Sequence, residues 1–472
     1  MPLFPTPRGN PDCMITDLTP NGFYIDACGL PGETKADGCF PAQHNTLRLS
    51  IDRWLVVYET RGFRGIDDNR SVVYQVRADA PTGRVLSEGY LDKCTFDWDP
   101  LGDGRQFQKL CNHTVVFGAP IGATRDGISL PHGGCFAAAW RRNPRIYDAE
   151  RKYVLSDDEG IAAGAPGDAY RCYWAQFRLK AGGDDIEITQ PPRELRELGC
   201  GEGPAPSRHS DLRIMNQGYV NPVPYAADAS EWAFLLHWSR GACDVEGVCT
   251  PIRFRWNKKT RLYEWVETGP ILDGPGEYGI FEGGIAAFRD EWLVSARVTR
   301  TPKKNLGNIW FRAKDLFDFD PVPFYATTPR SHAPRTTFTG PDGIVRVYTT
   351  DQEASPYADG KGGDPRMPLS VFAIDPDDNF RVTREAVVFD SFAAGLPIRR
   401  ESGPTAHFCR QLPHAGGDRG LLTYSVRPRA LLHERPAGRF KGLVNAEEMA
   451  VSGVYRTEIQ YDRSYPSVWA FA

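Results

Sequence analysis

The sequence predicts an all-β protein, a single β-propeller of about six four-stranded blades, with room for a seventh. Three observations lead to this fold class: frequent turn residues, many aromatic residues, and a pair of short apolar segments that recurs along the chain. Glycine (47) and proline (38) make up almost a fifth of the 472 residues. Such a composition favours many short strands over long helices. The 11 Trp, 19 Tyr and 25 Phe residues suit half-buried strand surfaces.

The recurring unit consists of two short apolar strands joined by a turn. Its six copies occupy 43–62, 112–142, 218–241, 282–300, 331–351 and 402–427. Outer strands are expected after each pair, at 70–91, 170–190, 249–267, 308–325, 368–389 and 449–461. Four strands per unit, joined by turns rich in Gly, Asp and Pro, are typical of propeller blades. A β-sandwich would need fewer strands, and a β-helix would repeat with a shorter and stricter period.

The domain organisation follows from the same pattern. No low-complexity linker divides the chain, so residues 1–472 are expected to form one domain, with segment 1–39 closing or decorating the ring. A seventh blade would have to lie within 92–110 or 141–170.

The 11 cysteines are scattered and form no CxxC pair, which argues against a zinc ribbon. We expect most of them to form structural disulfides, with Cys243 and Cys249 closing a small loop; the alternative is a set of buried free thiols. Disulfides predict an extracellular or periplasmic protein. The first residues, MPLFPTPRGNPDC, lack the basic start and apolar core of a signal peptide, so the signal of an exported precursor is expected to have been removed.

The charge and hydropathy of the chain narrow the choice of partners. The net charge of −4 gives no reason to expect nucleic acid or an anionic membrane as a partner. No segment approaches the ~18 apolar residues that a membrane-spanning helix needs. We expect a monomer that binds neither nucleic acid nor membrane.

The inner strands of a propeller begin near the central axis, where their loops build a funnel-shaped site. The residues that open the six inner strands are His44, His113, Tyr219, Glu282, His332 and His407. Four of the nine histidines thus fall at equivalent places in the repeat. Imidazoles in such a ring act as general acids and bases or orient substrate, or they bind a metal ion with Glu282, or they line a wet channel. No cofactor is expected other than that axial metal ion.

A second set of residues lies at the end of the second strand in most pairs. It consists of Arg61, Arg141, Arg240, Arg297 and Arg427, while the fifth unit carries Arg335 on its first strand instead. Guanidinium groups gathered around one opening would bind a carboxylate or a sulfate. This pattern predicts an anionic ligand. The alternative for each arginine is solvation or pairing with a loop carboxylate such as Asp67 or Asp68.

The segment FPAQHNTLRLSIDRWLVVYETRGFRGIDDNRSVVYQVR (40–77) resembles the opening blade of the sialidase superfamily and its BNR-repeat relatives. The His-Asn pair at 44–45, and YVNPV (219–223) followed by Arg240, are similar to the polysaccharide-active branch of ulvan lyases and rhamnosidase or rhamnosyl-glucuronate lyase propellers. That branch uses a tyrosine, an arginine and histidines on an anionic sugar. The chain departs from true sialidases in lacking the Asp-box motif (SxDxGxxW) and in carrying Gln43 or His44 where they have an arginine.

These observations predict a secreted carbohydrate-active enzyme that cleaves an acidic polysaccharide or glycoside. In an elimination, Arg240 or Arg61 would neutralise the uronate carboxylate, His44 or His113 would take the proton, and Tyr219 would protonate the leaving oxygen. In a hydrolysis a carboxylate pair is expected, for which Asp67, Asp68 and Glu282 are the candidates.

The other predicted site residues, Arg141, Arg335, Arg427, His332 and His407, would bind the acidic glycan together with Glu282. Two other functions stay open. One is a metal-dependent propeller enzyme that uses His44, His113, His332 and His407 as ligands. The other is a propeller that binds glycans without cleaving them.

Overall fold

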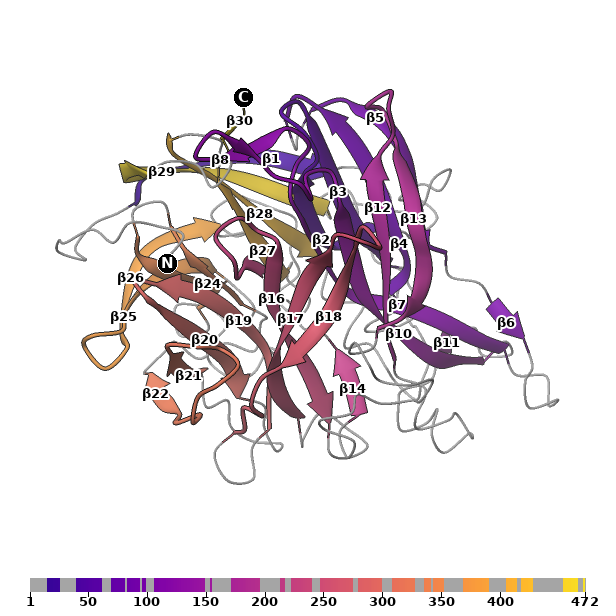
Figure 1. Cartoon of the computed structure of the whole chain (residues 1–472). Coiled ribbons are helices and arrows are strands. Elements are labelled where there is room, and N and C mark those ends of the chain that lie inside the picture. Colours follow the sequence, from indigo (N-terminus) through magenta and orange to yellow (C-terminus); the bar gives the residue numbers. More distant parts are fainter. Residues whose placement is uncertain are drawn as a thin grey trace.

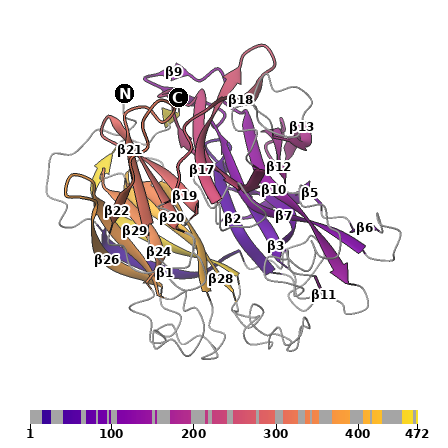
Figure 2. The same ribbon diagram turned by 90° about the horizontal axis from the view of Figure 1, so that it is seen from below.

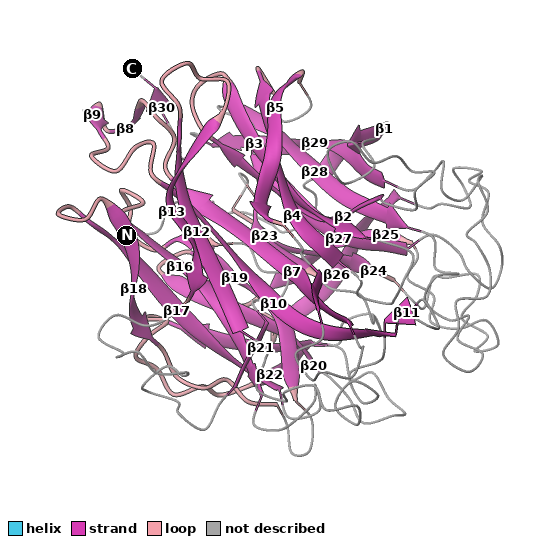
Figure 3. Cartoon of the chain, turned by 90° about the vertical axis from the view of Figure 1, so that its right-hand side faces the viewer, coloured by secondary structure: helices cyan, strands magenta, loops and turns pink. Residues whose placement is uncertain are grey.

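The structure is a computed structural model of the chain. It describes residues 15–25, 40–61, 69–80, 83–93, 96–98, 106–148, 153–154, 171–195, 213–216, 222–239, 247–274, 279–298, 308–326, 335–340, 343–351, 368–389, 405–413, 417–427, 453–465 and 470–471. Within these ranges the chain forms strands, turns and loops and no helix (Figure 3). The same ranges accordingly contain no helix that could cross a membrane.

Five sheets are built from consecutive strands. Sheet 1 contains β2 (Phe40–Arg48), β3 (Arg53–Arg61), β4 (Asn69–Ala78) and β5 (Val85–Asp92). Sheet 2 contains β6 (Phe96–Trp98), β7 (Gln106–Gly118), β10 (Phe136–Asp148), β12 (Arg171–Leu179) and β13 (Ile186–Glu194), with β11 (Tyr153–Val154) beside β10. Sheet 3 contains β14 (Arg213–Asn216), β15 (Val223–Pro224), β16 (Glu231–Ser239), β17 (Gly247–Asn257) and β18 (Leu262–Thr268).

The chain continues in the same way through two four-stranded sheets. Sheet 4 contains β19 (Ile280–Phe288), β20 (Glu291–Val298), β21 (Asn308–Ala313) and β22 (Phe324–Ala326). Sheet 5 contains β23 (Thr336–Thr339), β24 (Val345–Thr350), β25 (Leu369–Asp375) and β26 (Arg381–Phe389).

Sheet 6 joins the two ends of the chain. Its strands β27 (Thr405–Pro413), β28 (Gly417–Arg427) and β29 (Gly453–Tyr465) are followed by the N-terminal strand β1 (Ile15–Ile25), which pairs with β29 (Figure 2). A small three-stranded sheet places β30 (Ala470–Phe471) beside β8 (Ala123–Arg125) and β9 (Ile128–Ser129). Both ends of the chain thus pair with strands that are distant in the sequence.

The sheets follow one another around the molecule in sequence order (Figure 1). The inner part of each sheet contacts the next in a closed circuit: β2 with β7, sheet 2 with β14, β16 with β19, β19 with β23, β23 with β27, and β27 with β2. The all-β class and the propeller arrangement are therefore confirmed. The segments considered for a seventh blade supply β6 and β11, which belong to sheet 2.

The hydrophobic core lies between neighbouring sheets. In β10, Ala137 and Ala139 are fully buried, and their small side chains let sheet 2 approach sheet 3 closely. Phe117 of sheet 2 packs at this interface against Phe234 and Phe254 of sheet 3, with ring centroids 6.0 and 5.3 Å apart. Burial of such large rings is the main favourable term that holds the sheets together.

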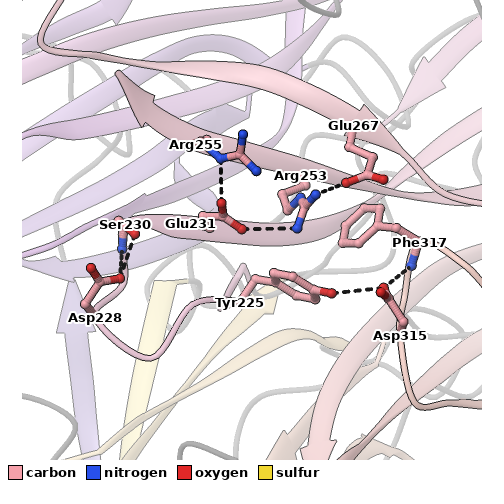
Figure 4. Close-up of polar contacts among 9 residues, drawn as sticks. All are labelled: Tyr225, Asp228, Ser230, Glu231, Arg253, Arg255, Glu267, Asp315 and Phe317. Atoms are coloured by element: carbon pink, nitrogen blue, oxygen red, sulfur yellow. Dashed lines mark hydrogen bonds and ion pairs between the residues drawn. The ribbon is translucent and has the colours of Figure 1, made fainter. Parts of the chain in front are cut away.

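Polar contacts join neighbouring sheets at the end of β16 where Glu231 lies (Figure 4). The hydroxyl of Tyr225 donates to Asp315, just after β21 of sheet 4, at 2.9 Å, and burial together with this carboxylate raises the pKa of Tyr225 to about 12. Arg253 lies between Glu231 and Glu267, with its guanidinium over the rings of Tyr225 and Phe317 at 5.1 and 5.0 Å. These contacts fix sheet 3 against sheet 4.

The predicted disulfide between Cys243 and Cys249 is wrong, because Cys249 is a buried free thiol whose Sγ lies 3.7 Å from the carbonyl oxygen of Ile280. Cys135 and Cys172 are also free, and no disulfide occurs among the described residues. Burial raises the pKa of the Cys172 and Cys249 thiols well above its usual range, which keeps them protonated and unreactive. Cys243 lies outside the described residues.

Thiol titration tests the number of free cysteines. Unfolded in denaturant without reductant, the protein should expose at least the three free thiols to Ellman's reagent, whereas a complete disulfide framework of 11 cysteines would expose one. In the native protein Cys172 and Cys249 should react much more slowly than Cys135, because they are buried. One reactive thiol in the unfolded chain would contradict the structure.

Candidate functional site

Four strands, β2, β7, β19 and β27, carry the same irregularity, a β-bulge in which two residues stand opposite one residue of the neighbouring strand. The pairs, each with its single partner, are Ala42–Gln43 with Glu59, His113–Thr114 with Trp140, Glu282–Gly283 with Ala296, and His407–Phe408 with Ser425. A bulge bends its strand and changes the direction of a side chain, and bulges are common beside functional sites.

The bulges give a common register in which the predicted inner-strand residues can be compared. His113, Glu282 and His407 each hold the first bulge position, so they are equivalent as predicted. The equivalence is wrong for His44, since Ala42 holds that position in sheet 1 and His44 lies two residues further along β2. His44 itself is fully buried. Tyr219 and His332 lie outside the described residues, as do the side chains of His113 and His407.

The predicted ring of arginines separates into two registers. Arg141 and Arg297 directly follow the single residue that faces the bulge, whereas Arg61 and Arg427 lie one residue further on. Arg335 directly precedes β23. Arg240 lies outside the described residues, as do the side chains of Arg61 and Arg427.

Among the described residues, five side chains from four successive sheets are linked by direct contacts or by charge interactions and are named here the central cluster: Arg141 (β10), His237 (β16), Glu282 (β19), Arg297 (β20) and Arg335. Glu282 forms a hydrogen-bonded ion pair with Arg297. The charges of Arg141 and Arg297 act on His237, and those of Arg297 and Glu282 act on Arg335. The structure thus brings together four residues that the sequence singled out, Arg141, Arg297, Glu282 and Arg335.

Arg335 stands apart from the other buried arginines. It is 1% exposed, and none of its three guanidinium nitrogens has a hydrogen-bond partner in the described part of the chain. Burial, together with the positive charge of Arg297, lowers the pKa of Arg335 to about 9, although Glu282 acts in the opposite direction. A buried guanidinium without partners is costly, and an anion with two oxygens would satisfy it.

His237 is the member of the cluster that the sequence did not single out. It is 2% exposed, and its Nδ1 accepts the backbone N–H of Glu282 at 3.2 Å. Burial, and then the charges of Arg297 and Arg141, lower the pKa of His237 to about 3. The imidazole is therefore neutral at pH 7 and is not a general acid there.

Glu282 has an unusual backbone conformation, with φ at +51° in a region that residues other than glycine seldom adopt. The next residue, Gly283, packs closely: a Cβ added there would lie 2.3 Å from the carbonyl oxygen of Ser295 and 2.7 Å from Cδ1 of Leu235. The bulge therefore needs glycine at its second position.

The substitution Gly283→Ala is expected to lower the free energy of unfolding by about 1–3 kcal/mol, because the new methyl group overlaps backbone that cannot move without shifting β20. Urea denaturation measures the loss. Gly182→Ala serves as the control, since a Cβ at Gly182 meets no atom within 4 Å. Equal stability of the two variants would contradict the tight packing of the bulge.

A second polar group lies between sheets 1 and 2. The buried carboxylate of Glu59 accepts the backbone N–H and the hydroxyl of Thr114 at 2.7 and 3.0 Å. The side-chain amide of Asn45 donates to the carbonyl oxygen of Thr114. These contacts connect β2 and β3 to β7 beside His44. Glu59, two residues before Arg61, was not a sequence candidate.

The metal alternative finds no support among the described side chains, where no group of three or more His, Cys, Asp or Glu residues is placed to hold a metal ion. Of the four proposed ligands, only His44 has a described side chain. The remaining three keep this alternative a prediction.

No model of a known protein family matches the sequence, and no curated protein is similar to it. Solved structures are similar to it in fold. Trypanosoma rangeli sialidase in complex with sialic acid superimposes with a TM-score of 0.52 at 7% identity, over 95% of this chain and 59% of that one. The K499G mutant of NanB sialidase from Streptococcus pneumoniae gives 0.51 at 8% identity, over 93% and 71%.

A protein of unknown function from Dyadobacter fermentans has a TM-score of 0.53 at 9% identity, over 96% of this chain and 100% of that one. Unlike the Dyadobacter protein, which is matched over its whole length, the T. rangeli sialidase is matched over only 59% of its length. At such low identities the similarity concerns the fold alone. The chain has the sialidase-like β-propeller fold.

Proposed function

We propose that the protein is a carbohydrate-active enzyme that cleaves an acidic polysaccharide or glycoside at the central cluster. The observation that carries the proposal is Arg335, a buried guanidinium whose three nitrogens have no hydrogen-bond partner among the described residues. Proteins rarely bury an uncompensated charge without a use for it. A carboxylate or sulfate on a sugar supplies two oxygens in the geometry that a guanidinium fork prefers.

Glu282 supports hydrolysis as the reaction. Its carboxylate belongs to the cluster and forms an ion pair with Arg297. A charged carboxylate beside the bound sugar can stabilise the positive charge that develops at the anomeric carbon, or attack that carbon. Water then adds across the broken glycosidic bond. The second carboxylate that hydrolysis requires is proposed to be Asp67 or Asp68, outside the described residues.

Elimination is the second candidate, with the roles proposed for Arg240, Arg61, His44, His113 and Tyr219. The two reactions differ in their products. Incubation with ulvan, arabinogalactan and pectic fractions should release new reducing ends, and a parallel rise in absorbance near 235 nm would indicate elimination instead. Binding without either product would make the protein a glycan-binding propeller.

Whether binding depends on a carboxylate of the sugar can be tested without knowing the polymer. D-Glucuronate should raise the melting temperature of the wild type, whereas D-glucose at the same concentration should not, because only the acid can pair with Arg335. Arg335→Met should abolish the shift. Equal shifts with the two sugars would overturn the proposal of an acidic substrate.

The closed circuit of contacts supports a ring of six blades, which we propose as the blade number. We also propose that the protein acts as a monomer outside the cytoplasm. Three free cysteines weaken the disulfide argument for that location, so it now depends on the polymeric substrate proposed above. Sedimentation velocity and fractionation of the producing cells test these two statements.

A further inference from the structure

The backbone of Glu282 is held by a residue from a neighbouring sheet. The pairing of β19 with β20 passes from Phe281 to Gly284 and skips the two bulge residues. The N–H of Glu282 instead donates to Nδ1 of His237 on β16, at 3.2 Å, and both residues are buried. The side chain of His237 in sheet 3 thus accepts the backbone hydrogen bond that a partner strand would otherwise accept from Glu282 in sheet 4.

This contact coincides with the strained position. A φ of +51° at a residue other than glycine is strained, and such a conformation persists only when the surroundings enforce it. The hydrogen bond that the Glu282 N–H donates to His237 and the packing around Gly283 both constrain this turn of the chain. The direction of the Glu282 carboxylate toward Arg297 follows from that backbone conformation.

We propose that His237 is a positioning residue. By accepting a hydrogen bond from the Glu282 amide, it holds the bulge so that the Glu282 carboxylate stays paired with Arg297. The guanidinium of Arg335 then remains able to pair with the acidic ligand. The statement about the ligand rests on the proposed function, whereas the statement about the bulge does not. The role requires an unprotonated Nδ1, and burial beside Arg297 and Arg141 keeps the imidazole neutral. With Nδ1 accepting, the single proton lies on Nε2.

The position of the acceptor atom makes the role testable. Asparagine can place Oδ1 close to where Nδ1 lies, whereas glutamine reaches further along the side chain and leucine offers no acceptor. His237→Asn should therefore preserve the function of the residue, and His237→Leu and His237→Gln should not. The polar His237→Gln variant keeps the test valid if His237→Leu fails to fold.

The first measurement is hydrogen exchange of the Glu282 amide in the full-length protein. His237→Leu and His237→Gln should accelerate it about tenfold, the effect of losing one hydrogen bond, while His237→Asn should change it less than about threefold. His132→Leu is the control, because His132 is a buried histidine of the loop before β10 and lies outside the cluster. Unchanged exchange in both His237→Leu and His237→Gln would overturn the proposal.

The second measurement is the affinity for D-glucuronate, from the ligand dependence of the melting temperature. It should fall about tenfold in His237→Leu and His237→Gln and stay near the wild-type value in His237→Asn and His132→Leu. Equal affinity in all four variants would contradict the link from His237 to the ligand. Absence of wild-type binding would instead contradict the proposed function, and the exchange measurement would still decide the role of His237 in the bulge.

Discussion

Arg335→Met is expected to raise the free energy of unfolding by about 1–4 kcal/mol while abolishing the response to acidic sugars. Methionine has a similar length and can fill the same buried space, but it carries no charge and needs no hydrogen bonds. Arg335 is fully buried without a hydrogen-bond partner in the described chain, so its removal relieves a desolvation penalty. Urea denaturation and the glucuronate melting shift give the two readouts on one variant.

The matched control lies in the same sheet. Arg346 of β24 is likewise fully buried, but Nε and Nη2 donate to the carboxylate of Glu385 at 2.7 and 3.3 Å. Arg346→Met leaves that carboxylate without its partner and should lower the free energy of unfolding by about 3–5 kcal/mol. Opposite signs for the two substitutions are the expected result. A loss of stability in both would mean that Arg335 supports the fold and is not held ready for a ligand.

Stability should also fall steeply as the pH is lowered from about 6.5 toward 3, because of His237. Its pKa is about 3 in the folded protein and about 6.5 in the unfolded chain. Between these values the unfolded chain binds a proton that the folded protein does not, so each pH unit removes about 1.4 kcal/mol of stability. Above about pH 6.5 neither state is protonated and the contribution is constant.

The contribution of His237 is isolated by comparison with His237→Asn. Between pH 7 and pH 5 the wild type should lose about 2 kcal/mol more than the variant in urea denaturation. The pKa of His132 is also lowered by burial, against the charge of Asp228, but this residue is present in both proteins and cancels. Parallel pH profiles would show that His237 becomes protonated in the folded state.

Apolar periodicity located most of the strand pairs, because the paired strands are covered by their neighbours and read as short apolar runs. Ala137–Ala139 of β10 and Leu55–Val57 of β3 are examples, fully buried in the structure. In the third unit the predicted pair at 218–241 missed β14, which precedes it and pairs with β16. The bulges could not be predicted in the same way. A bulge depends on two residues facing one, and the pairs Ala42–Gln43 and Glu282–Gly283 share no motif. His44 was therefore aligned two residues away from its equivalents.

Four of the five members of the central cluster could be found in the sequence. Arg141, Arg297, Glu282 and Arg335 were singled out because of their positions in the recurring strand pairs. His237 was not, because it lies within an apolar strand segment and its contact is with Glu282 of the next sheet. The error at Cys249 has a different cause: close spacing in sequence suggested a disulfide to Cys243, but β17 buries Cys249 in the core, against Ile280.

The pairing of β1 with β29 has a consequence for how the protein folds. Five sheets can form from adjacent segments as the chain is synthesised, but Ile15 must wait for Tyr461 before the last sheet is complete. Closing so long a loop costs more chain entropy than pairing two strands that are adjacent in the sequence. This step should therefore come late and limit the folding rate. The same junction, together with β30 on β8, is where thermal opening of the ring should begin.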